Sequence, residues 1–149
     1  MSDISLIKDQ LKKLLKAQRF AVLSTHSDQQ PYASLVAFAA TNDLRELVFV
    51  TGSDSRKYKN LIADSRAAMM IDNRTNKKSD IQNAVAATAC GFANVIDKTS
   101  SQDLIKLYLA KHPDLEQFMI SSNSVVISLS IKKYYFVAQF QNVYELSMD

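Results

Sequence analysis

Glycine, cysteine, proline and tryptophan are scarce in this chain or missing from it. Its 149 residues include two glycines, two prolines, one cysteine and no tryptophan. Two glycines are too few for a GxGxxG dinucleotide fingerprint, and no GxxxxGK[ST] phosphate loop occurs. The single cysteine, Cys90, allows no internal disulfide bond, so we expect a reducing, cytoplasmic location.

Long apolar runs and a strong charge of one sign are also missing. The longest apolar candidate, Ala84–Ile96, is too short to span a membrane and contains Thr88 and Asn94. The N-terminal segment carries acids early and lacks the continuous apolar core of a signal peptide. The net charge is only +3, and the basic residues form small separate clusters. We therefore expect no membrane and no nucleic-acid partner, and a compact anion suits these clusters better than a long polyanion.

Residues that bind metals or act as nucleophiles are few and scattered. His26, Cys90 and His112 lie on three separate predicted elements without ligand spacing, so no metal site is predicted. Small apolar residues surround Cys90, which favours inert packing over nucleophilic catalysis. His112 ends a predicted helix, where the negative end of the helix dipole favours a positive charge.

Hydrophobic periodicity predicts one domain, residues 1–149, that contains both helices and strands. Helices are predicted from Ile4 to Leu15 with Ser2 or Asp3 as the cap, over Arg56–Ala63, from a cap at Thr99 or Ser100 to His112, and over Leu115–Ile120. Strands are predicted over Phe20–Thr25, Tyr32–Ala40, Glu46–Thr51, Ala67–Asp72 and Ala84–Ile96. A turn over His26–Pro31 and a polar loop over Asn73–Asn83 separate some of these elements.

The last stretch, Val125–Met148, has a strand-like pattern throughout. Its apolar residues change parity after Lys132 and Lys133, and a parity change within one strand implies a bulge or a bend. Small barrels use such bends at their corners. Six or so strands with helices inserted between them therefore suggest a closed β-barrel of the α+β class.

The stretch Leu47–Asp64 predicts a strand, a tight turn and the start of a helix. Ser55 precedes the helix, and Arg56 and Lys57 form its first turn. Cations are unfavourable there, because a helix N-terminus is already the positive end of the peptide dipole. A bound phosphate would remove this conflict, whereas the alternative is that both cations are simply solvated.

Small residues on the predicted strands leave space for a flat ring to approach the backbone. These residues are Ala33, Ser34, Ala37, Ala84, Ala86 and Ala87. The alternative is that they only allow close packing between layers.

Several of these stretches together resemble the FMN-binding split-barrel proteins related to pyridoxamine 5′-phosphate oxidase. They are PYASLV (Pro31–Val36), LVFVTGSDSRKYKNL (Leu47–Leu61), DNRTN (Asp72–Asn76), AVAATACGFANVI (Ala84–Ile96) and YYFVAQFQNVYEL (Tyr134–Leu146). The resemblance runs from about Leu14 to Leu146. It implies a six-stranded antiparallel split β-barrel with flanking helices, and a homodimer that binds two FMN molecules at its interface.

The resemblance also implies roles for individual residues. Arg56 and Lys57, helped by Ser55, are expected to bind the FMN phosphate. Val50 and Thr51 are expected along the ribityl chain and the ring. Backbone contacts to the isoalloxazine are expected from Ser34, Leu35 and Val36. Asn73 and Arg74 match a motif near the flavin in close relatives. Beyond the resemblance, our own hypothesis is that Arg74 places positive charge beside the N1–C2 edge of the ring, which would favour the anionic reduced flavin.

The chain departs from the true pyridoxamine phosphate oxidases in three places. Ser34 and Ala86 align where those enzymes have Arg and Gln, and the ending FQNVYELSMD lacks their Trp- and Arg-containing segment. No histidine follows His112, so the C-terminal histidine of the haem-degrading branch is missing as well. The expectation is an FMN-dependent oxidoreductase of open substrate. The alternatives are a non-catalytic flavin- or haem-binding sensor or carrier, and a barrel that only dimerises.

Overall fold

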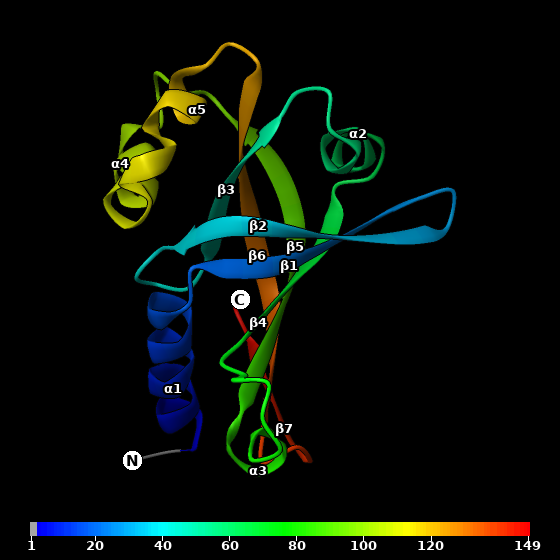
Figure 1. Cartoon of the computed structure of the whole chain (residues 1–149), viewed down its shortest axis with the longest axis vertical. Coiled ribbons are helices and arrows are strands. Elements are labelled where there is room, and N and C mark those ends of the chain that lie inside the picture. Colours follow the sequence, from blue (N-terminus) through cyan, green and yellow to red (C-terminus); the bar gives the residue numbers. More distant parts are fainter. Residues whose placement is uncertain (1–2) are drawn as a thin grey trace.

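The computed structural model describes residues 3–149, which form a closed β-barrel with helices around it (Figure 1). The strands are β1 (Phe20–Ser27), β2 (Gln30–Ala40), β3 (Glu46–Gly52), β4 (Arg66–Asp72), β5 (Val85–Ile96), β6 (Ser124–Ala138) and β7 (Asn142–Ser147). The helices are α1 (Asp3–Ala17), α2 (Arg56–Ala63), α3 (Asp80–Asn83), α4 (Gln102–Lys111) and α5 (Glu116–Ile120), with a 3-10 turn over Pro113–Leu115. Within residues 3–149, no helix has the length and apolar character needed to cross a membrane.

Six strands close the barrel, and all their pairings are antiparallel. Hydrogen bonding follows the order β3-β2-β1-β4-β5-β6, and a further pairing of β3 with β6 closes the ring. The last strand, β7, lies outside the ring as a hairpin partner of β6. The predicted α+β class and six-stranded antiparallel barrel with flanking helices are confirmed.

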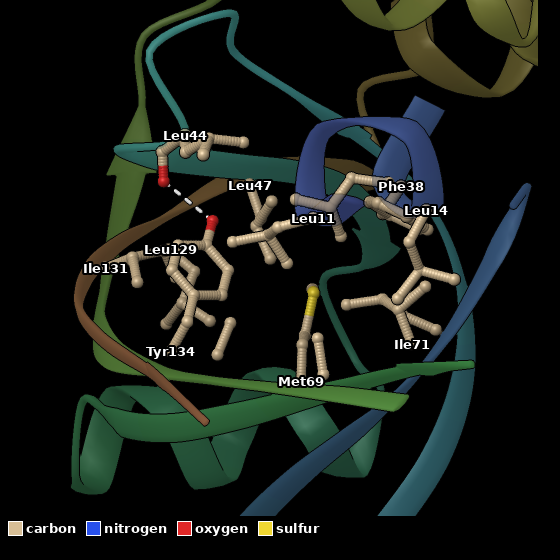
Figure 2. Packing of buried hydrophobic residues seen from close by; sticks show 14 of the residues in the cluster. Leu11, Leu14, Phe38, Leu44, Leu47, Met69, Ile71, Leu129, Ile131 and Tyr134 are labelled. Carbon is tan, nitrogen blue, oxygen red and sulfur yellow. Dashed lines mark hydrogen bonds between the residues drawn. The ribbon is translucent and has the colours of Figure 1, made fainter. Parts of the chain in front are cut away.

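The barrel interior and one face of α1 share a single hydrophobic core (Figure 2). Leu11, Leu14 and Leu15 of α1 are buried in it, as the helical spacing predicts. Tyr134 of β6 is fully buried, and its hydroxyl donates to the backbone oxygen of Leu44 at 2.6 Å. That bond satisfies the one polar atom of this side chain, so the aromatic ring can fill the core without an unpaired group.

Several predicted boundaries are wrong by a few residues. The first hairpin turn contains only Asp28 and Gln29, both at positive φ, so His26 and Pro31 belong to strands that pair with each other. Such two-residue turns match the twist of the strands that they join. The predicted Ser2 cap lies outside the described residues, and Asp3 is already the first residue of α1.

Three other elements also differ from the prediction. Helix α4 begins after Ser101 rather than after Thr99 or Ser100, because the Asp97 carboxylate binds Thr99 and the backbone N–H of Ser100 in a preceding turn. The loop over Asn73–Asn83 contains the short helix α3. The final strand-like stretch is two strands, because Gln139 and Phe140 at positive φ form a hairpin turn.

The predicted bend near Lys133 is confirmed as a bulge between β5 and β6. Cys90 pairs with Lys133 while the next residue, Gly91, pairs with Ile131, so Lys132 is the extra residue. A Cβ on Gly91 would lie 2.0 Å from the backbone oxygen of Ser130. The two strands therefore approach so closely here that only glycine fits.

Candidate functional site

Strands β2 and β3 pair over three residues and then separate. Their ladder joins Phe38 to Phe49 at its last rung. The same register would place Ala37 opposite Val50, yet within residues 3–149 this pair is not part of the ladder. The backbone oxygen of Ala37 instead accepts a hydrogen bond from the Tyr108 hydroxyl of α4 at 3.2 Å. We call the opening between β2 and β3 beyond this point the split.

The sequence-predicted strand residues lie on the two sides of the split. Ser34, Leu35 and Val36 continue β2 beyond the last rung, and Val50 and Thr51 continue β3. The N–H of Phe38 points toward the β1 side, where it donates to the oxygen of Arg19. Because backbone groups alternate direction along an antiparallel strand, those of Leu35 point away from β1 and toward the split.

One buried polar atom beside the split has no hydrogen-bond partner in the described part of the chain. This atom is the hydroxyl oxygen of Ser34. Its residue pairs with Leu23 of β1 and shares a strand face with Val36, which is buried. Leaving a buried hydroxyl unpaired costs about 1–3 kcal/mol, so this position suits contact with a polar ligand.

The first turn of α2 lies at the outer end of the split. Ser55 caps the helix: its Oγ accepts from the N–H of Tyr58 at 3.2 Å and is 2.9 Å from the Thr51 hydroxyl. Those contacts tie the helix start to the end of β3. The N–H groups of Arg56 and Lys57 precede the first intrahelical bond and have no acceptor among the described residues.

The cations at this helix start form no ion pair with an acid in residues 3–149, although Asp54 directly precedes the Ser55 cap. The first turn of α2 contains no acidic residue. Arg56 is exposed, and its guanidinium lies 5.7 Å from the ring centroid of Tyr32 on β2. Lys57 is half-buried, and neither cation takes part in an ion pair within the described chain. Two cations and two free N–H groups together form an anion-binding arrangement.

Sequence reasoning missed Tyr32 as a site residue and also missed what holds α2 in place. Asn60 of α2 donates to the Thr25 hydroxyl of β1 at 3.0 Å, and His26 lies 2.9 Å from the Asp64 carboxylate. Arg66 binds the same carboxylate and holds the pKa of Asp64 well below its usual range. The contacts of Asn60 with Thr25 and of His26 with Asp64 join residues far apart in the chain, so local pattern carries no signal for them.

Asn73 and Arg74 lie away from the helix start. Asn73 closes the end of the β4–β5 loop, where its Oδ1 accepts from the N–H of Val85 at 2.8 Å. The Arg74 guanidinium pairs with Asp72 at 3.0 Å. Arg74 also lines a cavity of about 380 Å³ together with the side chain of Leu35, which is 66% exposed. Leu35 therefore connects the split to the surface on which Arg74 lies.

The remaining candidate residues lie elsewhere. Cys90 is half-buried and faces Lys133, and its pKa is raised by burial, which fits the predicted inert role. His112 is buried, with Nε2 2.7 Å from the oxygen of Phe38. Burial lowers the pKa of His112, so the neutral form is favoured rather than the predicted cation. Residues 3–149 contain no cluster of three or more His, Cys, Asp or Glu side chains arranged to bind a metal.

Comparison with protein families gives one match to this chain. The family model described as pyridoxamine 5′-phosphate oxidase matches residues 7–138. No curated protein matches the chain.

Solved structures share the fold at low sequence identity. The haem-binding protein from Mycobacterium smegmatis superposes with a TM-score of 0.82 at 15% identity, over 94% of this chain and 57% of that protein. General Stress Protein 26 from Bacillus anthracis gives a TM-score of 0.73 at 16% identity, over 95% of this chain and 98% of that protein. A FAD-binding protein from Mesorhizobium loti gives a TM-score of 0.66 at 18% identity, over 85% of this chain and 89% of that protein. The chain thus spans just over half of the mycobacterial protein.

Proposed function

Because the chain belongs to the pyridoxamine 5′-phosphate oxidase family, we propose that it is an FMN-binding flavoprotein and a homodimeric oxidoreductase. The observation that supports this proposal is the convergence at the split of an unpaired hydroxyl, a free strand edge and an uncompensated cationic helix start. A flavin mononucleotide has one group for each of them: a polar ring edge, a ribityl chain and a phosphate.

The proposed phosphate site is the first turn of α2. Arg56 and Lys57 supply charge, their free N–H groups supply donors, and the Ser55 cap fixes the direction of the helix. Along β2, the distance from Tyr32, which contacts Arg56, to Leu35 is about 10 Å at the normal strand rise. A ribityl chain can span this distance between Val50–Thr51 and the edge of β2.

The proposed ring site lies where β2 leaves β3. Leu35 offers its backbone groups and Ser34 its unpaired hydroxyl to the polar edge of the ring, whereas the expected backbone contacts from Ser34 and Val36 are less favoured because those groups face β1. Arg74, which follows β4, lines the cavity that Leu35 enters, and its guanidinium is paired there with Asp72, so a flavin ring would share this cation with that carboxylate. A cation near the ring favours a negatively charged reduced flavin. When bound, FMN supplies the redox chemistry, and the protein binds and orients it.

Haem is the alternative ligand, since one structure with this fold is a haem-binding protein. The chain has two histidines, and both already have partners: His26 binds Asp64, and His112 binds the Phe38 oxygen. Each contact uses only Nε2, and a ligating histidine usually has such an oxygen on its other ring nitrogen, so the contacts themselves do not disfavour haem. Neither histidine belongs to β2 or β3 beside the split, whereas the cationic start of α2 suits a phosphate, and this favours the flavin.

The visible absorption spectrum of the freshly purified full chain, followed by titration with FMN and with haemin, tests this proposal. Flavin bands, or quenching of FMN fluorescence at one FMN per chain, are the expected result. A Soret band without flavin bands would show that the ligand is haem rather than FMN. A colourless protein that binds neither ligand would exclude both the flavin and the haem hypotheses. The remaining hypothesis would then be a barrel that dimerises without a ligand.

Turnover is tested separately on the FMN-loaded protein. NAD(P)H consumption or rapid reoxidation of the reduced flavin by oxygen is expected of an oxidoreductase. If FMN binds at one per chain and neither reaction occurs with a panel of donors and acceptors, the non-catalytic carrier replaces the oxidoreductase.

A further inference from the structure

A second cavity lies between α1, α4 and the turn that joins β2 to β3. Its volume is about 610 Å³, within the range of about 300–1,000 Å³ that is usual for small-molecule sites. None of its lining residues belongs to the split or to the first turn of α2. It is therefore a separate site, and the proposed flavin chemistry gives it no role.

The floor of this cavity is apolar. Small side chains from β2 and α4, Ala39, Ala40 and Ala110, leave the space open, and Leu15, Leu44 and Leu107 line its sides. The cavity reaches down to the core, because three of its lining residues are almost fully buried: Ala39, Leu15 and Leu44. An apolar ligand body would be well accommodated here.

The cavity is also lined by three lysines and by no acid. Lys12 and Lys16 are spaced by four residues on α1, where like charges repel, and Lys111 reaches the cavity from α4. None of the three forms an ion pair within residues 3–149. The acid of the neighbouring turn, Asp43, is bound by the Thr41 hydroxyl and the N–H of Arg45.

Lys111 is the most constrained of the three lysines. Its Nζ donates to the backbone oxygen of Leu15 at 2.9 Å and lies 4.0 Å from the ring centroid of Phe38. Burial, with a smaller contribution from the charge of Arg19, lowers the pKa of Lys111 to about 8. The ammonium thus lies partly out of water without a counter-ion, a state that a bound anion would stabilise.

From the apolar floor and the three uncompensated lysines together, we propose that this cavity binds a small amphipathic carboxylate. The apolar body occupies the space between α1 and α4, and the carboxylate lies at the rim against Lys12, Lys16 and Lys111. A medium-chain fatty acid or an arylalkanoic acid has this chemistry. Free phosphate and acetate lack the apolar body, and an uncharged alcohol lacks the head group.

Calorimetric titration of the full chain with decanoate, below its micelle concentration and at pH 7, tests the proposal. Saturable binding of one decanoate per chain is expected, with decanol and acetate at least tenfold weaker. Decanol that binds as well as decanoate, or decanoate that does not bind, overturns the proposal.

Substitutions assign the binding to this cavity. Lys111→Met keeps the length of the side chain and is expected to weaken decanoate binding about tenfold or more, because it removes one charge-assisted contact. Ala110→Glu is a second, independent variant that keeps the test valid if Lys111→Met does not fold. It adds a negative charge at an exposed helix position that lines the cavity, and it should abolish decanoate binding. The matched control is Lys106→Met, on an exposed part of α4 outside the cavity.

Unchanged decanoate affinity in folded Lys111→Met or Ala110→Glu protein overturns the proposal, as does an equal loss in Lys106→Met. FMN binding is measured in parallel. It should stay unchanged in all three variants, because none of these residues belongs to the split. Failure of this site and failure of the flavin proposal are therefore distinguishable.

Discussion

At the scale of single residues, the start of α2 shows how a local conflict indicates a ligand. Ser55 satisfies the Tyr58 N–H, while Arg56 and Lys57 add charge where the helix dipole is already positive. No side chain among the described residues neutralises them. A phosphate at this position would satisfy both the charges and the free N–H groups.

The double variant Arg56→Ala, Lys57→Ala should weaken FMN binding by about 3 kcal/mol or more, because it removes two charge-assisted contacts. Fluorescence titration with FMN measures the loss. Lys59→Ala, an exposed position one turn into the same helix, is the control and should change the affinity little. Wild-type affinity in the double variant would exclude this turn as the phosphate site.

Gly91 illustrates a residue whose role is purely steric. A Cβ there would collide with the Ser130 backbone, which cannot move without opening the β5–β6 bulge. Gly91→Ala should therefore lower the free energy of unfolding by about 3 kcal/mol. Urea unfolding of the variant and the wild type measures this loss of stability. Gly52→Ala is the comparison. The nearest atom to a Cβ at this position would be Asp54 Oδ1, at 3.4 Å, so this variant should lower the free energy of unfolding by less than about 1 kcal/mol. Equal costs in the two variants would contradict this explanation.

At the scale of elements, α4 is fixed to β2 where that strand leaves its ladder with β3. The Tyr108 hydroxyl binds the Ala37 oxygen, and His112 Nε2 binds the Phe38 oxygen. The Ala37 oxygen lies at the inner end of the split, whereas the Phe38 oxygen, like the N–H of that residue, faces the β1 side. Helix α4 thus helps to define where β2 and β3 separate.

Acid should weaken this anchor through His112. Its pKa is lowered in the folded state, mainly by burial, whereas in the unfolded chain it titrates near about 6.5. Below that pH the unfolded state binds more protons than the folded state, so stability falls as the pH falls. Urea unfolding from pH 7 to pH 5 measures the slope.

The matched variant for this test is His112→Gln. An amide N–H can still donate to the Phe38 oxygen but does not titrate. The variant should therefore lose less stability than the wild type between pH 7 and pH 5. Parallel slopes for the two proteins would show that His112 does not carry the acid sensitivity.

At the scale of the whole molecule, a barrel with exposed apolar side chains beside its proposed flavin site suggests association. Phe20 is 55% exposed and Leu35 is 66% exposed, and both line the cavity that contains Arg74. A second copy of the chain could cover these side chains and enclose the flavin.

Sedimentation velocity of the FMN-loaded protein should therefore give the mass of two 16.7 kDa chains. Phe20→Glu should shift this equilibrium toward the monomer, because it places a charge on the apolar surface. A monomer at tens of micromolar protein, with FMN bound at one per chain, would contradict the homodimer.

The sequence by itself determined the elements and much of their order. Alternating and helical apolar patterns predicted α2 with the bounds that the structure has, and the parity change near Lys133 predicted the bulge, because both signals are local. The proposed phosphate site at the start of α2 was equally open to prediction, since Ser55, Arg56 and Lys57 are adjacent. The turn at Asp28–Gln29 was predicted with bounds that were too wide, and the turn at Gln139–Phe140 was missed, because both use left-handed backbone without glycine.

Only the tertiary structure decided which of these pieces meet. The β2–β3 ladder stops at Phe38, and the Tyr108 hydroxyl of α4 binds the next backbone oxygen, in a contact that joins residues 71 positions apart. The same packing leaves the Ser34 hydroxyl unpaired, places Tyr32 beside Arg56 and brings three lysines around an apolar cavity. Contacts between distant segments depend on how the barrel closes, and no local pattern encodes them.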